Sequence, residues 1–152
     1  RQCLLLGFLL TPVMAVGQAP DFAETLRQAS QGDGLVTRLA QYNLGVMYAN
    51  GDGVPQNYSE AMKWYRRAAD QGDPDAQYNL GLMYASGDGV PSNYVTAYAW
   101  VDIAVASENS SADLHLAARE VRSDLEERMT PSQIAEAQQL STEIFERIQG
   151  NQ

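Results

Sequence analysis

The stretch AQYNLGVMYA at residues 40–49 returns as AQYNLGLMYA at residues 76–85, thirty-six positions later. When residues 40–69 are aligned with residues 76–105, nineteen of the thirty positions are identical. Self-similarity at a fixed period of this length is typical of stacked supersecondary units. The sequence therefore predicts an array of repeats, with repeats at 40–75 and 76–111.

Each repeat is predicted to be a hairpin of two helices. In the second copy, Asp73 is suited to cap the first helix and Pro74 to occupy its first turn. In the first copy, a Gly-Asp-Gly-Val-Pro loop follows at 51–55, and Asn57 is expected to cap a second helix that runs to Gly72. Neither repeat leaves room for a strand, so the fold class expected is all-α.

Helical periodicity indicates which side of each helix is buried. With about 100° per residue, Leu44 and Tyr48 share one side of the first helix, and Ala61, Trp64 and Ala68 form an inner stripe on the second helix. Small side chains opposite large ones predict interdigitated helix packing. The positions that carry this structural signature in the two copies are Leu44, Gly45, Tyr48, Gly51, Gly53, Ala61, Trp64, Ala68, Leu80, Gly81, Tyr84, Gly87, Gly89, Ala97, Trp100 and Ala104.

The other face of the second helix is charged in the first repeat and is expected to face solvent. Its residues are Glu60, Lys63, Arg66, Arg67 and Asp70. In the second repeat, Ala99 and Ile103 stand where Lys63 and Arg67 stood. We therefore expect the downstream helices to cover this face of the second repeat.

The segments on either side of the two repeats are also predicted to be helical. A partial third repeat is expected at 112–129, followed by a capping helix at 131–149, because Thr130 and Gln133 have the spacing of a capping box. At the other end, 21–30 has the pattern of a short helix. The linker after it is about four residues longer than the corresponding turn between the repeats, so the first helix of the first repeat is expected to start early.

The first nineteen residues have the layout of a signal peptide that is cleaved. Arg1 precedes an apolar run that starts at Cys3, and small residues follow at Ala15, Gly17 and Ala19, where cleavage is expected. The apolar stretch is shorter than the ~20 residues needed to span a bilayer, so no stable membrane span is expected after its removal. The missing Met indicates a truncated start. The expected location is periplasmic or extracellular.

Composition excludes several functional classes. A net charge of -9 makes nucleic acid a poor partner. The chain has one Cys, one His and one Lys, which leaves little material for a metal site, thiol chemistry or lysine-centred catalysis. We expect no metal and no cofactor.

The motif Ala, three residues, Leu-Gly, two residues, Tyr, then Gly-Asp-Gly-Val-Pro, then Ala, two residues and Trp resembles the Sel-one-like repeat, a relative of the tetratricopeptide repeat. The ending RMTPSQIAEAQ resembles that of short exported bacterial members. The resemblance implies a right-handed α-solenoid of helical hairpins, whose first helices line a concave surface that binds a protein or peptide partner. The array is shorter than many relatives, and the paired cysteines of the disulfide-stapled Helicobacter-type members are missing.

Residues on the outer side of the first helices predict a binding groove, because a fully solvated face would be more polar. Tyrosine would supply flat contact area and asparagine would pair with a peptide backbone. Alternatively, these side chains pack between successive repeats. The candidate protein-binding residues are Tyr42, Asn43, Val46, Tyr78, Asn79 and Leu82.

No catalytic constellation stands out, and we expect no enzyme. Some relatives have been labelled β-lactamases, but that chemistry needs a Ser three residues before Lys, and Glu60 precedes Lys63. His115 lies near Ser110, Ser111 and Asp113, a pattern more typical of a helix cap. The Asp52 and Asp88 loops fit turns better than an EF-hand. The function predicted is a non-enzymatic exported adaptor; the alternatives are a cell-wall or glycan-binding module and, less favoured, a β-lactamase-like hydrolase.

Overall fold

The computed structural model describes residues 21–32 and 34–150, so the predicted signal peptide at 1–19 lies outside the described part. Every regular element within those ranges is a helix. The helices are α1 (Phe22–Ala29), α2 (Leu35–Asn50), α3 (Tyr58–Asp70), α4 (Pro74–Ser86), α5 (Tyr94–Ala106), α6 (Ala112–Arg128) and α7 (Pro131–Gly150).

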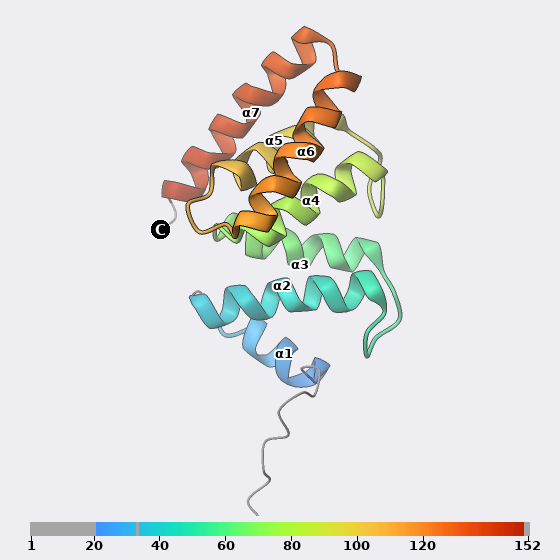
Figure 1. Cartoon of the computed structure of the whole chain (residues 1–152). Coiled ribbons are helices and arrows are strands. Elements are labelled where there is room, and N and C mark those ends of the chain that lie inside the picture. Colours follow the sequence, from blue (N-terminus) through green and yellow to red (C-terminus); the bar gives the residue numbers. More distant parts are fainter. Residues whose placement is uncertain (1–20, 33, 151–152) are drawn as a thin grey trace, which may run out of the picture.

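The helices stack in chain order from α1 to α5 (Figure 1). The α2/α3 and α4/α5 pairs form hairpins, and α3 packs on α4 to join the two. This arrangement confirms the predicted all-α solenoid of helical hairpins.

The helix ends follow from local sequence. The Asn57 side chain accepts a hydrogen bond from the Glu60 backbone N–H at 3.1 Å, and the Asp73 side chain accepts one from the Ala76 N–H at 2.9 Å. These contacts satisfy donors that a helix N-terminus leaves free. Gly87 ends α4 with φ +87°, a conformation that glycine adopts without steric strain. The predicted caps are therefore confirmed.

Inside each hairpin, a glycine on the first helix receives a side chain from the second. A Cβ added to Gly45 would lie 2.4 Å from the ring of Tyr65, and one added to Gly81 would lie 2.4 Å from Val101 Cγ2. Tyr65 and Val101 occupy the same repeat position, thirty-six residues apart. The glycine thus allows the two helices to approach closely in both repeats.

A second recurring contact joins each first helix to the helix before it. The Gln41 side chain donates to the Ala29 carbonyl at 3.2 Å, and the equivalent Gln77 donates to the Ala69 carbonyl at 3.3 Å. In this respect α1 takes the place of the second helix of a preceding hairpin. As expected, α2 starts early, at Leu35, three residues ahead of the register set by α4.

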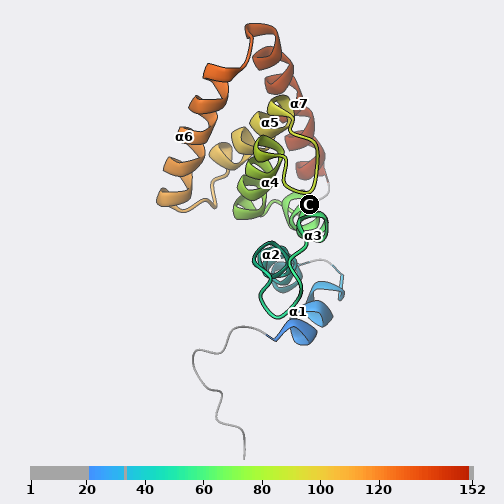
Figure 2. The ribbon, with the colours of Figure 1, turned by 90° about the vertical axis from the view of Figure 1, so that its right-hand side faces the viewer.

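The last two helices do not pair with each other as a third hairpin. They splay apart, and each packs on a different side of α5 (Figure 2). Ile144 and Ile148 of α7 join the buried cluster that contains Ala99 and Ile103, which confirms the predicted cover. The Thr130 N–H donates to Gln133 Oε1 at 2.9 Å and the Gln133 N–H to Thr130 Oγ1 at 3.3 Å, as a capping box requires.

On the charged face of α3, Arg66 and Asp70 are only partly solvated, with side chains 41% and 37% exposed. The Arg66 guanidinium lies 4.9 Å from the ring centroid of buried Trp100, and its Nε donates to Asp70 at 3.1 Å. Asp70 also pairs with Arg147 of α7, again at 3.1 Å. A guanidinium can lie on an aromatic ring while it bonds a carboxylate, so this polar pair covers apolar surface.

We predict that Gly81→Ala destabilises the array. The new Cβ would meet Val101 Cγ2 and also the Ala97 carbonyl oxygen at 3.1 Å, so backbone as well as side chain must shift. Such overpacking costs about 1–3 kcal/mol, against the ~1 kcal/mol by which alanine favours a helix over glycine. Urea denaturation is the measurement. Gly150→Ala, whose Cβ meets nothing within 4 Å, is the control; equal stability of both variants would contradict the close-approach argument.

We predict that Asp73→Asn flattens the pH dependence of stability. Burial raises the pKa of the Asp73 carboxyl, despite the opposing Ala76 N–H and Arg38. A raised pKa in the folded state means that this group's contribution to stability falls as the pH rises above about 4. Asparagine keeps the cap without the charge. As the pH rises above about 4, the free energy of unfolding of the native protein should therefore fall relative to that of the variant. A rise instead would mean that the fold lowers the pKa of Asp73.

Candidate functional site

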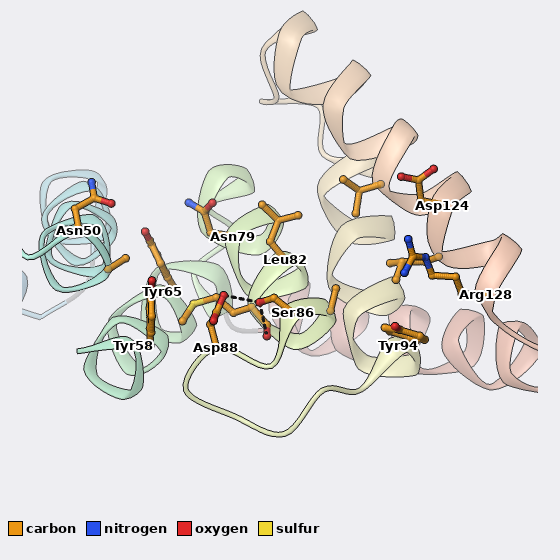
Figure 3. Close-up of a pocket in the computed structure, with 15 residues that line it drawn as sticks. Asn50, Tyr58, Tyr65, Asn79, Leu82, Ser86, Asp88, Tyr94, Asp124 and Arg128 are labelled. Carbon is orange, nitrogen blue, oxygen red and sulfur yellow. Dashed lines mark hydrogen bonds between the residues drawn. The ribbon is translucent and has the colours of Figure 1, made fainter. Parts of the chain in front are cut away.

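A groove of about 590 Å³ crosses α4 between α2 and α6. Figure 3 shows Asn79 and Leu82 of α4 lying between Asn50 of α2 and Asp124 of α6. The groove is therefore formed by the first helices of the two repeats together with the helix that follows them. Its other principal lining residues are Tyr58, Tyr65, Asp88, Tyr94, Leu125 and Arg128.

The groove combines aromatic, apolar and charged groups. Tyr58 is 40% exposed, and its hydroxyl oxygen accepts a hydrogen bond from Gln56 Nε2 at 3.1 Å. Tyr65 is buried, and burial raises the pKa of its hydroxyl, so the group stays neutral. Asp88 accepts a hydrogen bond from the Ser86 hydroxyl at 2.6 Å. Such a surface can hold an apolar side chain and also pair with polar groups beside it.

The six predicted binding residues do not share one surface. Asn79 and Leu82 line the groove. Their equivalents in the first repeat, Asn43 and Val46, line a separate cavity of about 660 Å³ beside Phe22 of α1. The two repeats thus have different neighbours, α6 beside the second and α1 beside the first, and the part of these four residues in binding stays a prediction.

The two predicted tyrosines lie in the packing between helices. The ring of Tyr42 lies 5.8 Å from the ring of Tyr65, centroid to centroid. Tyr78 packs against the buried cluster that includes Ala97 and Ala118. Both are half-buried, and burial raises the pKa of each hydroxyl. Neither lines the groove, and their part in binding stays a prediction.

Sequence reasoning missed several groove residues. Tyr58 and Tyr94 are the same position in the two repeats, an identity that could have drawn attention to them. Asp124 and Arg128 had no such signal, because they lie on α6, where the repeat pattern has weakened.

Three of the side chains considered for catalysis have partners within the fold. The Ser111 hydroxyl accepts the Leu114 N–H at 3.2 Å and caps α6, and the Ser110 hydroxyl donates to the Ala104 carbonyl at 3.1 Å. Lys63 pairs with Glu60 on the same helix. The interpretation of the two serines as cap residues is thus confirmed for Ser111.

The described residues contain neither a metal-binding cluster nor a helix able to span a membrane. Over 21–32 and 34–150, there is no group of three or more His, Cys, Asp or Glu side chains placed to hold a metal ion. None of the helices in this part of the chain combines the length and the apolar character that crossing a membrane requires.

The fold and the groove together define a solenoid of helical hairpins, and comparisons with known proteins give its class. The family described as "Sel1 repeat" matches residues 38–73 and 74–107. These boundaries begin two residues before the predicted 40 and 76. No curated protein matches the chain.

Several solved structures resemble the chain, and two of them illustrate the similarity. One is c5321, a protective antigen present in uropathogenic Escherichia coli strains displaying an SLR fold, with 35% identity and a TM-score of 0.72 over 84% of this chain. The matched region is 25% of c5321, so the chain spans about a quarter of that protein. The other is a Sel1 repeat protein from Oxalobacter formigenes, with 28% identity and a TM-score of 0.45 over 58% of this chain and 42% of that one.

The chain therefore contains two Sel1 repeats, and its helices form the SLR fold. This fold is typically that of a non-catalytic scaffold, and Sel1 repeats usually mediate interactions between proteins.

We predict that the double substitution Tyr42→Ala, Tyr78→Ala lowers stability. Each change removes a half-buried ring; because full burial is worth about 3–5 kcal/mol, we expect a loss of about 1–3 kcal/mol for each. Thermal denaturation followed by circular dichroism measures the effect. An unchanged transition would show that neither ring contributes to packing between helices. Both tyrosines would then again be candidates for contact with a partner.

Proposed function

We propose that this protein is a non-enzymatic adaptor that holds a segment of a partner protein in the groove between α2 and α6. The observation that carries the proposal is the groove itself, which places tyrosine, leucine and asparagine side chains on one open surface of three first-type helices. The usual role of Sel1 repeats points the same way.

The lining residues define what the partner segment should offer. Leu82 and Leu125 provide apolar surface for an aliphatic or aromatic side chain, and Asn79 can pair with an extended backbone. Two aspartates, Asp88 and Asp124, line the groove together with a single arginine, Arg128. With a net charge of -9, the protein favours a partner with basic residues.

The adaptor proposal involves no catalytic step and no cofactor. It also places the protein in the periplasm or outside the cell, on the strength of the apolar run and small residues in 1–19.

A glycan-binding module is the second candidate. Tyr58 and Tyr94 occupy the same repeat position and both line the groove, and tyrosine rings can stack on sugar rings. Binding to purified peptidoglycan in place of peptides would favour this candidate.

We predict that Leu82→Asp weakens peptide binding while the chain stays folded. Peptides selected from a random displayed library against the native protein should be enriched in basic and apolar residues. Fluorescence anisotropy then compares affinities. Because Leu82 is half-buried in the groove, a charge there should weaken binding about tenfold or more.

Val46→Asp is the matched control, since Val46 holds the same repeat position but lies in the cavity beside α1. It should leave peptide affinity unchanged. If Val46→Asp rather than Leu82→Asp removes binding, the groove is not the binding site. If no peptide is selected and peptidoglycan binds, the adaptor proposal fails.

A further inference from the structure

The cavity beside α1 and the groove over α4 are built from the same repeat positions. The cavity takes an aromatic ring, an asparagine, an aliphatic side chain, a methionine and an aspartate from α1, α2 and the loop after α2. These residues are Phe22, Asn43, Val46, Met47 and Asp52, and the residue thirty-six positions after each of them lines the groove. The cavity is therefore a second copy of one part of the groove.

The aspartate is held in the same way in both copies. Asp52 Oδ2 accepts a hydrogen bond from Asn50 Nδ2 at 3.3 Å. Asp88 Oδ2 accepts one from the Ser86 hydroxyl at 2.6 Å, and Asn50 and Ser86 occupy the same repeat position (Figure 3). Because a carboxylate can accept hydrogen bonds at both oxygens, Oδ1 of each aspartate is left for a ligand.

The aromatic residue lies beside the same loop in both copies. A Cβ added to Gly53 would lie 4.0 Å from Phe22 Cβ. One added to the equivalent Gly89 would lie 2.8 Å from the backbone carbonyl carbon of Tyr58. An edge-to-face contact with Tyr48, at 5.7 Å between ring centroids, orients the Phe22 ring. Each copy thus combines an oriented aromatic ring with a carboxylate.

The charge of the cavity favours a cation. Asp21 and Asp52 both line it, and no lysine or arginine is among its lining residues. Within residues 21–32 and 34–150, no ion pair involves either aspartate. The groove, by contrast, has Arg128 as well as two aspartates. A positive ligand should therefore be favoured over a neutral one more strongly in the cavity than in the groove.

The protein itself shows which cation such a set of groups can hold. The Arg66 guanidinium lies 4.9 Å from the ring centroid of Trp100 while its Nε donates to Asp70 at 3.1 Å. A planar guanidinium can thus lie on an aromatic ring and bond a carboxylate at the same time. In the cavity, Val46 and Met47 add apolar surface that matches the alkyl stem of an arginine.

We propose that the cavity beside α1 binds an arginine side chain of a second partner segment, separate from the segment in the groove. Asp52 Oδ1 accepts hydrogen bonds from the guanidinium, Asp21 adds negative charge, and the Phe22 ring and the aliphatic side chains contact the rest of the side chain. This inference extends the proposed function to a second site. It depends on the cavity's own residues, so it can hold whether or not the groove binds a peptide.

The test is an NMR titration of the full chain with N-acetylarginine amide. We expect the backbone resonances of Asn43, Val46 and Gly53 to shift, with a Kd on the order of 1 mM for so small a ligand. N-acetylcitrulline amide has the same length without the charge, and it should bind the cavity about two- to fivefold more weakly.

Equal affinity of the cavity for both compounds would overturn the inference, because the carboxylates would then have no part in binding. Shifts confined to Asn79 and Leu82 would also overturn it and would leave the proposed groove untouched. Shifts confined to the cavity would support the inference and count against the groove.

Two matched variants separate the sites. Asp52→Asn should weaken N-acetylarginine amide at the cavity about two- to fivefold and leave any shifts at Leu82 unchanged, since it removes one exposed charge. Asp88→Asn, at the same repeat position, should leave the shifts at Val46 unchanged. Thermal denaturation checks that both variants fold. If Asp52→Asn does not fold, Asp21→Asn takes its place, because the Asp21 side chain makes no capping hydrogen bond. Unchanged affinity at the cavity in whichever of these two variants folds would contradict the site.

Discussion

The structure depends on the close approach of two helices at a glycine. Because Gly45 and Gly81 have no side chain, Tyr65 and Val101 can sit against the backbone of the opposite helix. This contact fixes how the two helices of each hairpin cross. The crossing then determines which face of the first helix packs inside the hairpin and which face remains available to other helices or to a partner. The groove over α4 exists because that face stays open while the opposite face is filled.

The C-terminal helices give the array its asymmetry. With α6 on one side of α5 and α7 on the other (Figure 2), α5 has seven buried residues, against five in its equivalent α3. Trp100 is fully buried, whereas its equivalent Trp64 is 9% exposed, with the Arg67 guanidinium over its ring at 4.5 Å from the centroid. The same arrangement supplies the α6 wall of the groove. The groove therefore owes one of its walls to a helix outside the matched repeats.

The local features of the fold could be predicted because each depends on few residues close in sequence. Helix caps at Asn57 and Asp73 need only a side chain and the next turn. The cover over Ala99 and Ile103 was predictable for another reason. The charged Lys63 of the first repeat is replaced by Ala99 at the same position of the second repeat, which indicates a change from solvent to a buried environment.

The groove was predicted only in part, since periodicity gives the face of a helix but not its neighbours. Asn43 and Asn79 have the same register, yet one lies near α1 and the other between α2 and α6. The contact between Arg66 and Trp100 was missed for a related reason: the charge of Arg66 predicted a solvated side chain, but its guanidinium also lies over the Trp100 ring. Neither outcome could be read from one repeat alone.

The hydrogen bond from Gln41 to α1 and the one from Gln77 to α3 make the same junction twice. A junction that recurs unchanged is a seam at which whole hairpins can be inserted or deleted without new chemistry. Duplication of one hairpin at the α3/α4 seam would lengthen the row of first helices while both ends of the solenoid kept their present contacts. Growth of such a protein in evolution, or by engineering, can then proceed by complete units and leave the terminal helices untouched.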